Sequence, residues 1–280
     1  MMRYLLLAVV FWVCDTRAQS DLAFNKRFVQ SEDKWVAYKA DKDGSHGYGF
    51  IYIDPVAGLT LQLEGNFKVD GAGTFIAKKM EHNTKYRLQP NNVLVAWIPE
   101  NRFGELKIDA VPDWLRFYKT DTTSVKHFYD WGFRYNAWEE CAKGLTYLEK
   151  AAAIDPNFKG LAVELAFSYN CLGQYTKAVP VLRSALVATP LDAYVHKELV
   201  YAYVKSGQLD SAAISCKNAI AVCTDKSYHG EMCYNLMHEW YQHKDKKNFQ
   251  LWLPEIKKWI TDQANLQASI KIMEDELEKM

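Results

Sequence analysis

The stretch that decides the fold is Ala162-x-x-Leu165-Ala166-x-x-Tyr169-x-x-x-Gly173-x-Tyr175-x-x-Ala178-x-x-x-Leu182-x-x-Ala185-x-x-x-x-Pro190. Spacings of three and four place its apolar side chains on one stripe of each of two helices, separated by a short turn at Gly173. Alanines stand where the two helices approach closely, and Pro190 closes the second helix. The stretch therefore predicts a helical hairpin.

The same pattern recurs every 34 residues on both sides of this stretch. The recurring positions include Tyr135, Tyr169 and Tyr203, then Leu148, Leu182 and Cys216, then Ala151, Ala185 and Ala219. One hairpin cannot bury its stripe alone, so neighbouring hairpins are expected to stack into a solenoid. The pattern resembles the tetratricopeptide repeat (TPR), which has this period. The resemblance covers residues 125–224 and a divergent unit near 227–262, and it implies a surface that holds another molecule.

Three features depart from the repeat. Gly144 stands where alanine is usual, which is expected to weaken the second helix of the first unit, and Val200 replaces a small residue. Thr224 stands where the third unit would have its proline. Residues 263–280 form an amphipathic stripe that favours a capping helix over the last repeat, with a dimer contact and a frayed tail as alternatives.

The amino terminus has the pattern of a secretory signal over residues 1–18. A basic start is followed by the apolar run Tyr4–Cys14 and by small residues that favour cleavage before Gln19. The run is shorter than the roughly 20 residues that span a bilayer. Lipidation at Cys14 is the alternative, and the bulky Val13 disfavours it. The expected location is periplasmic or extracellular, with no transmembrane segment after cleavage.

Charge and composition exclude some partners. Residues 1–18 hold two basic and one acidic side chain, which leaves 32 basic and 33 acidic ones. A net charge near zero gives no electrostatic reason to bind nucleic acid or acidic lipid. Apolar residues make up 49% of the chain and aromatic residues 14%, which is enough for packed cores. The length fits about two domains.

Residues 19–118 are predicted to form a β-rich domain, because short apolar runs alternate with Gly, Asn, Asp and Pro turns. The expected strands are Lys34–Lys39, Tyr48–Asp54, Leu59–Gly65, Thr74–Lys78, Lys85–Gln89, Val93–Ile98 and Glu105–Ile108. The fold class is therefore α+β: an antiparallel β-sandwich or open β-barrel, then a TPR solenoid of three to four hairpins over 125–262 and a capping helix over 263–280. The polar stretch Thr120–Ser124 marks the boundary.

No catalytic, cofactor or metal site is expected. His238-Glu239-x-x-x-His243 has one residue too many for a zinc-protease helix, because five steps of about 100° turn the second histidine off the shared face. Asp41-x-Asp43-Gly44 indicates a hairpin turn rather than a calcium loop. The five cysteines after residue 18 are interpreted as buried thiols, and a Cys216–Cys233 bridge stays open as an alternative.

The TPR resemblance places the first helix of each unit on the concave face, and this gives the candidate site. The side chains expected there are Tyr129, Phe133, Asn136, Val163, Phe167, Asn170, Tyr194, Lys197 and Tyr201. All but Val163 form the candidate partner-binding set. The positions that match the carboxylate clamp of chaperone-binding TPR domains hold residues such as Glu164 and Glu198, so that activity is not expected.

A protein or extended peptide is the expected partner. Phe133, Phe167 and Tyr201 would form the contacting stripe, and Asn136 and Asn170 would hydrogen-bond the peptide backbone. Burial of these aromatic residues against the chain itself is one alternative. An enzyme or accessory subunit with its site between the two domains is the other. The sequence specifies neither the partner nor the oligomeric state.

Overall fold

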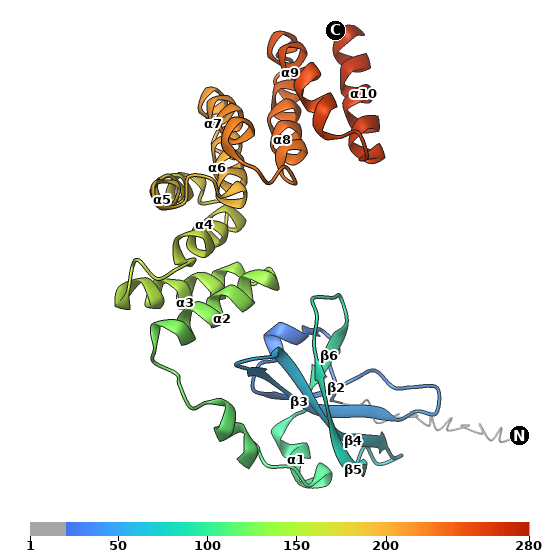
Figure 1. The fold of residues 1–280 in the computed structure, drawn as a ribbon. Helices are drawn as coiled ribbons and strands as arrows, with labels where there is room; N and C mark the ends of the chain where they lie inside the picture. The colour runs from blue at the N-terminus through green and yellow to red at the C-terminus, as the bar shows by residue number, and fades with distance from the viewer. Residues whose placement is uncertain (1–20, 280) are drawn as a thin grey trace, which may run out of the picture. The chain divides into compact units, whose positions relative to one another are not determined.

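The computed structural model describes residues 21–279, which divide into two compact units at Thr120 and Asp121 (Figure 1). The expected signal segment 1–18 and its cleavage before Gln19 lie outside the described residues. Within the described residues, no helix is both long enough and apolar enough to cross a membrane.

The first unit is built on one open antiparallel sheet. Its strands are β1 (Lys26–Arg27), β2 (Lys34–Ala37), β3 (His46–Asp54), β4 (Gly58–Val69), β5 (Phe75–Arg87) and β6 (Leu94–Trp97). The strand order is β1-β6-β2-β3-β4-β5, so β1 and β5 are the edges. The expected antiparallel β-rich unit is confirmed, and it is one open sheet rather than the two packed sheets of a sandwich.

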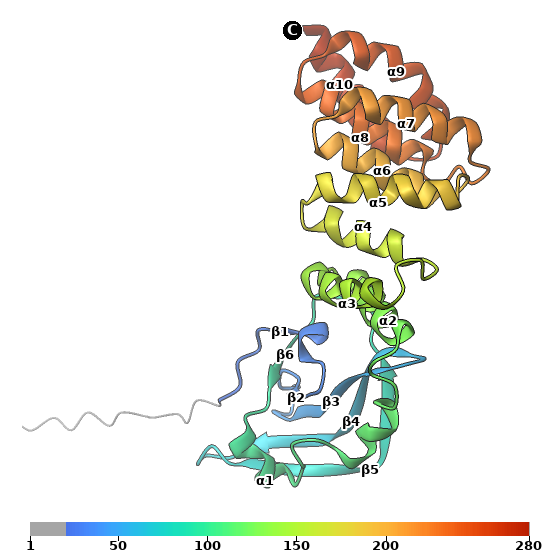
Figure 2. The same ribbon diagram turned by 90° about the vertical axis from the view of Figure 1, so that its left-hand side faces the viewer.

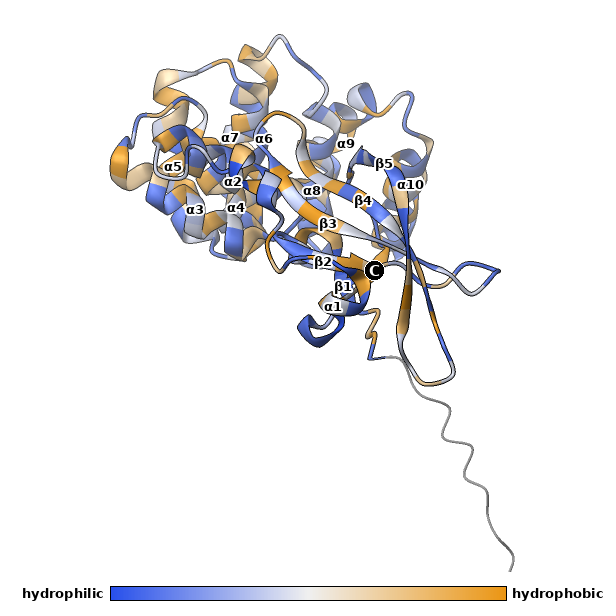
Figure 3. Cartoon of the chain, turned by 90° about the horizontal axis from the view of Figure 1, so that it is seen from below, coloured by the Kyte–Doolittle hydropathy of each residue, from blue (hydrophilic) through white to orange (hydrophobic). Residues whose placement is uncertain are grey.

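One face of this sheet carries an aromatic core. Alternation along β3 places Tyr48, Phe50 and Tyr52 on that face, where all three are fully buried. Figure 3 shows the hydrophobic segments along β3. The helix α1 (Phe103–Leu106) and the 3-10 helix η3 (Asp113–Tyr118) supply residues that pack on this core. Two more 3-10 helices, η1 (Phe28–Ser31) and η2 (Glu100–Arg102), lie in the connections.

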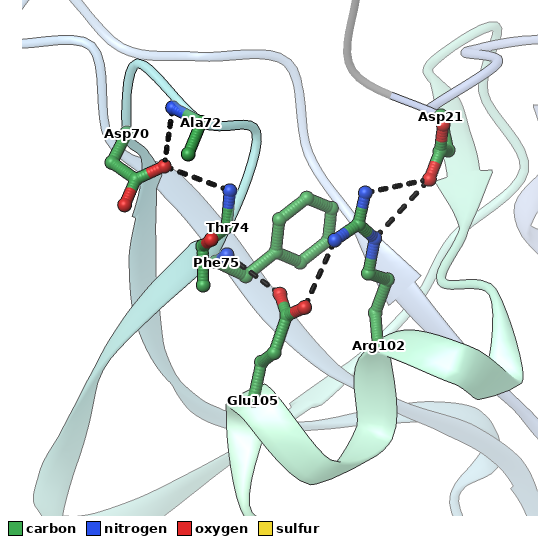
Figure 4. Close-up of polar contacts among 7 residues, drawn as sticks. All are labelled: Asp21, Asp70, Ala72, Thr74, Phe75, Arg102 and Glu105. Carbon is green, nitrogen blue, oxygen red and sulfur yellow. Dashed lines mark hydrogen bonds and ion pairs between the residues drawn. The ribbon is translucent and has the colours of Figure 1, made fainter. Parts of the chain in front are cut away.

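The strand expected at Glu105–Ile108 is wrong, because these residues begin in α1. Glu105 accepts a hydrogen bond from the backbone N–H of Phe75 over 2.7 Å and pairs with Arg102 over 2.9 Å. Arg102 also binds Asp21 over 2.8 Å (Figure 4). Glu105 thus ties α1 to the start of β5, and these contacts fix a helix in place of a seventh strand.

The two strands expected at Thr74–Lys78 and Lys85–Gln89 are one strand, β5. The register jumps at Glu64 of β4, opposite residues 80–83, so four residues bulge outward without ending the strand. The Asn83 side-chain amide donates to Glu64 over 3.1 Å across this bulge. The polar bulge resembles a turn in sequence, which explains the error.

The second unit consists of four helix pairs and a final helix (Figure 2). The pairs are α2 (Val125–Ala137) with α3 (Cys141–Ile154), α4 (Leu161–Cys171) with α5 (Tyr175–Ala188), α6 (Ala193–Lys205) with α7 (Leu209–Val222), and α8 (His229–Gln242) with α9 (Lys246–Trp259). The last helix, α10 (Ala264–Lys279), contacts α8 and buries Ile270, Met273 and Leu277. The TPR-like helical array is confirmed, and α10 covers its last pair.

Two glycine residues, Gly132 and Gly144, lie where α2 and α3 of the first pair cross. A Cβ atom on Gly144 would lie 2.5 Å from Oδ1 of Asn136 and 3.1 Å from the carbonyl oxygen of Gly132. A Cβ atom on Gly132 would lie 2.4 Å from Leu148. Gly144 is therefore required by a close approach between α2 and α3, a role that its effect on helix propensity does not reveal.

The tyrosine and alanine series of the repeat contribute unequally to the core. Tyr135 and Tyr203 are buried, whereas Tyr169 is only partly buried in the middle pair. Ala151 and Ala219 are fully buried, and Ala185 is partly buried. Tyr169 and Ala185 are therefore less enclosed than the matching residues of the neighbouring repeats, although both pack against the core.

Candidate functional site

The first helices of the pairs form the inner layer of the array. α2 contacts α4, α4 contacts α6, and α6 contacts α8. The second helices contact the first helices on either side of them, as α5 does with α4 and α6. Close spacing of the first helices curves the stack toward them, so the sides of α2, α4, α6 and α8 that face away from the second helices form the inner face.

A cavity of about 290 Å³ opens on this inner face and is called the inner cavity below. Its lining residues are Phe167, Asn170, Cys171, Tyr175, Lys197, Glu198, Tyr201 and Glu231. They come from α4, α6 and α8 and from the start of α5. The inner cavity brings together four residues of the predicted site, namely Phe167, Asn170, Lys197 and Tyr201.

The other predicted residues lie outside the inner cavity. Tyr129 stacks on Phe133 with ring centroids 6.4 Å apart and contacts Phe158 at 5.1 Å. Phe133 is 47% exposed, so it adds an aromatic surface on α2. Tyr194 lies 5.8 Å from Tyr228, ring to ring.

Asn136 and Asn170 join successive first helices. The Asn136 amide donates to the backbone oxygen of Glu164 over 3.0 Å and to its carboxylate over 2.9 Å. The Asn170 amide donates in the same way to Glu198, over 3.2 Å and 2.8 Å. Both asparagines are buried. Their amide donors are therefore used within the array rather than left for a peptide backbone.

Carboxylates give the inner face its electrostatic character. Burial raises the pKa of Glu164; the Asn136 hydrogen bond opposes this, and the nearby Glu198 carboxylate adds to it. Burial also raises the pKa of Tyr194, with further contributions from Glu198 and Glu164. Acidic groups from neighbouring repeats are thus close enough to act on one another.

The ammonium group of Lys197 lies among these acidic groups. The Lys197 Nζ atom is 2.8 Å from Oε1 of Glu198 and 3.9 Å from Oε1 of Glu231. It also lies 4.6 Å from the ring centroid of Tyr194 and 5.6 Å from that of Tyr228. This ammonium group is therefore held by carboxylates and aromatic rings together.

Sequence reasoning missed Tyr175 and Glu231 in the inner cavity. The ring of Tyr175 contacts that of Tyr201 at 6.0 Å, so the start of the second helix completes the aromatic wall. The recurrence of Glu164 and Glu198 at the same interval as Asn136 and Asn170 was the available signal for the acidic groups. Glu231 falls one residue out of that register.

The cysteines differ from the expectation in part. Cys141 and Cys171 form a disulfide that joins the start of α3 to the end of α4. The Cys216 and Cys233 sulfurs lie 3.9 Å apart on neighbouring helices, but they are free thiols. The bridge considered between them is absent from the structure, and the bridge that exists joins two other cysteines.

The residues of the two patterns that resemble metal-binding motifs form hydrogen bonds with residues close to them in the chain. Asp43 accepts hydrogen bonds from the backbone and hydroxyl of Ser45 over 3.0 Å and 2.7 Å, as a hairpin turn requires. The ring of His243 contacts the carbonyl oxygen of Glu239, one turn before it in the chain, over 2.8 Å. Across residues 21–279, no three His, Cys, Asp or Glu side chains are grouped as a metal ion would need.

The first unit has a larger hollow on its sheet, with a volume of about 820 Å³. Its walls are mainly apolar and include Leu61, Leu63, Tyr86 and Val93. Gly47 lies beneath it, and a Cβ atom there would approach Asn66 at 3.4 Å. This hollow contains none of the predicted site residues.

Comparison with known proteins gives similarities of fold. No family model matches the chain, and no curated protein matches it. Among solved structures, MamA (residues 41 to the end) from Desulfovibrio magneticus RS-1 is 21% identical, with a TM-score of 0.45, over 59% of this chain and 86% of that one. TTC0263, a thermophilic TPR protein of Thermus thermophilus, is 16% identical, with a TM-score of 0.44, over 62% and 91%.

A third similar structure, MamA MSR-1, is 22% identical, with a TM-score of 0.43, and covers 64% of this chain and 88% of that one. Similarity at these values does not assign a function. The 34-residue periodicity and the paired helices of this chain make it a TPR-like helical repeat protein with an amino-terminal β-sheet unit.

Proposed function

We propose that this chain is a non-enzymatic assembly module that binds a protein or an extended peptide on the inner face of its helical array. The observation that carries the proposal is the inner cavity, where Phe167, Tyr175 and Tyr201 line a hollow made by successive repeats. Aromatic side chains in a hollow are typical anchors of protein interfaces. A continuous inner face built from repeated helices suits an extended partner.

We propose also that the chain works in the periplasm or outside the cell. The apolar run Tyr4–Cys14 and the small residues before Gln19 support this, because they have the pattern of a cleaved signal. The Cys141–Cys171 disulfide supports it independently, since such bonds persist in oxidising compartments. Amino-terminal mass spectrometry should find Gln19 as the first residue, and a lipid-modified Cys14 would contradict cleavage at that site.

The binding proposal is tested with Phe167→Ala. A partner is captured with the full chain from its native envelope fraction, identified, purified and titrated against both proteins. The variant should bind about 1–3 kcal/mol more weakly while its circular dichroism and melting temperature stay close to those of the parent. Ile214→Ala is the matched control, because Ile214 is 70% exposed on the second helix α7.

The alternative is that Phe167 belongs to the core of the array. In that case Phe167→Ala lowers the melting temperature while the affinity per folded molecule stays unchanged. Equal losses of affinity in Phe167→Ala and Ile214→Ala would also contradict the proposal, because Ile214 lies on a second helix.

A further inference from the structure

Acidic side chains recur along the inner face. Asp130, Glu164 and Glu198 occupy the same repeat position on α2, α4 and α6, and Glu231 follows on α8. Two of these four carboxylates, Glu198 and Glu231, line the inner cavity, and Lys197 is the one basic residue that lines it. The lining therefore has an excess of negative charge. An acidic partner segment would be repelled there, and a basic one attracted.

Lys197 shows what kind of group this surface holds. Its ammonium group pairs with Glu198 at 2.8 Å and approaches Glu231 at 3.9 Å, while two tyrosine rings lie within 5.6 Å of it. Carboxylates that accept charge-assisted hydrogen bonds and rings that present their faces are the two features that recognise an ammonium or guanidinium group. In this chain these carboxylates and rings hold the ammonium group of Lys197.

Glu231 offers further capacity for a cation beside Lys197. Glu164, whose carboxylate accepts a hydrogen bond from the Asn136 amide, is not among the residues that line the inner cavity. Glu231 keeps half of its side chain exposed at the rim of the inner cavity. Phe167, Tyr175 and Tyr201 provide ring surfaces in the same cavity. A cationic side chain entering there would meet the Glu231 carboxylate and these rings.

Building on the proposed function, we infer that the inner cavity selects a basic partner segment and takes lysine or arginine side chains between its carboxylates and its aromatic wall. The recognised unit is an extended, positively charged stretch of protein. This charge preference is opposite to that of TPR domains that clamp a carboxylate tail with basic side chains, and it follows from Glu198 and Glu231 in this chain.

The test titrates the full chain with three unstructured peptides of about twelve residues built from Gly, Ser and Ala, in which every third residue is Arg, Gln or Glu. Fluorescence anisotropy should give a dissociation constant at least tenfold lower for the arginine peptide than for the glutamine peptide, which corresponds to about 1.4 kcal/mol of binding free energy. The glutamate peptide should not bind. Raising the salt concentration from ~0.05 to ~0.5 M should weaken the arginine peptide most.

Glu231→Gln should weaken the arginine peptide about threefold or more and leave the glutamine peptide unchanged. Glu149→Gln is the matched control, because Glu149 is an exposed carboxylate on the second helix α3. It removes the same charge from a position outside the inner cavity and should change neither affinity. Equal effects of the two substitutions would show attraction by overall charge only and would overturn the inference.

The outcomes separate the charge preference of the inner cavity from the binding of a partner on the inner face. If the arginine and glutamine peptides bind equally and Phe167→Ala weakens both, the inner face is a docking surface without charge selection. If the arginine peptide does not bind, the inference is wrong. If, in addition, a purified partner binds Phe167→Ala as well as it binds the parent, the proposed function is wrong too.

Discussion

The hydroxyl of Ser168 donates a hydrogen bond to Oδ1 of Asn136 over 2.7 Å, within the contact between α2 and α4. In the next repeat Asn170 occupies the position of Asn136, and Ala202 occupies that of Ser168. Within the described part of the chain, Oδ1 of Asn170 is buried and has no hydrogen-bond partner. One repeat therefore satisfies this acceptor and the following one does not.

This difference predicts the effect of Ala202→Ser. The new hydroxyl should reach Oδ1 of Asn170, as Ser168 reaches Asn136, and should raise the free energy of unfolding by roughly 1 kcal/mol. Ser168→Ala should lower it by about 1–3 kcal/mol, because Asn136 then loses its donor. Urea denaturation measures both changes. Destabilisation by Ala202→Ser would show that the two repeats are not equivalent at this contact.

Gly144→Ala should destabilise the chain although it favours helix formation. The added methyl group would collide with Asn136 and the backbone of Gly132, which costs about 1–3 kcal/mol, against a propensity gain of about 1 kcal/mol. Gly104→Ala is the control, because a Cβ atom there meets nothing within 4 Å. Thermal denaturation should show a lower melting temperature for Gly144→Ala only; an increase would mean that α2 and α3 are farther apart.

Loss of the Cys141–Cys171 disulfide should cost about 2–4 kcal/mol, because the bond closes a loop between residues 30 apart in sequence. Cys141→Ser and Cys171→Ser should each lower the melting temperature, and a reducing agent should have little further effect on either variant. Cys223→Ala removes a thiol that forms no disulfide and should keep the reductant sensitivity of the parent. A parent protein that is insensitive to reductant would contradict the bond.

His229 predicts a loss of stability on acidification. Burial, and then the charge of Lys226, lower the pKa of this histidine in the folded chain. The unfolded chain then binds the proton more readily, so the stabilisation is complete above pH ~6.5 and is lost as the pH falls below that value. His229→Phe keeps an aromatic ring against Trp259 and should flatten this pH dependence.

The measurement is the free energy of unfolding between about pH 5 and 8. Neither ring nitrogen of His229 has a hydrogen-bond partner in the described part of the chain, so His229→Phe should cost no hydrogen bond. His243→Gln, at an exposed histidine, is the control and should keep the parent slope. An unchanged slope in His229→Phe would assign the pH dependence to other groups.

The helical half of the fold could be predicted because the same residue types recur three times at intervals of 34 residues. Tyr135, Tyr169 and Tyr203 fix the register even though they are buried to different extents. The β half has no such repetition. The bulge opposite Glu64 and the helix at Glu105 depend on contacts between distant segments, such as Phe75 with Glu105, which local pattern does not reveal.

The candidate site could be predicted from the same 34-residue periodicity, but its contacts between distant residues could not. Periodicity placed Phe167, Lys197 and Tyr201 on one face, and the inner cavity unites them. It could not show that Asn136 and Asn170 are used between helices, because that depends on the carbonyl and carboxylate of a residue 28 positions later. Pairing among five cysteines depends on the same three-dimensional contacts.

The central claim is that a partner docks on the inner face, and site-specific photo-crosslinking tests it most directly. A photoreactive phenylalanine analogue replaces Tyr201 in the inner cavity in one protein and Ile214 on α7 in another. Both proteins are illuminated with the purified partner, and the adducts are mapped by mass spectrometry. The account predicts a partner adduct at position 201 and none at position 214. Adducts at 214 alone, or equal adducts at both positions, would contradict it.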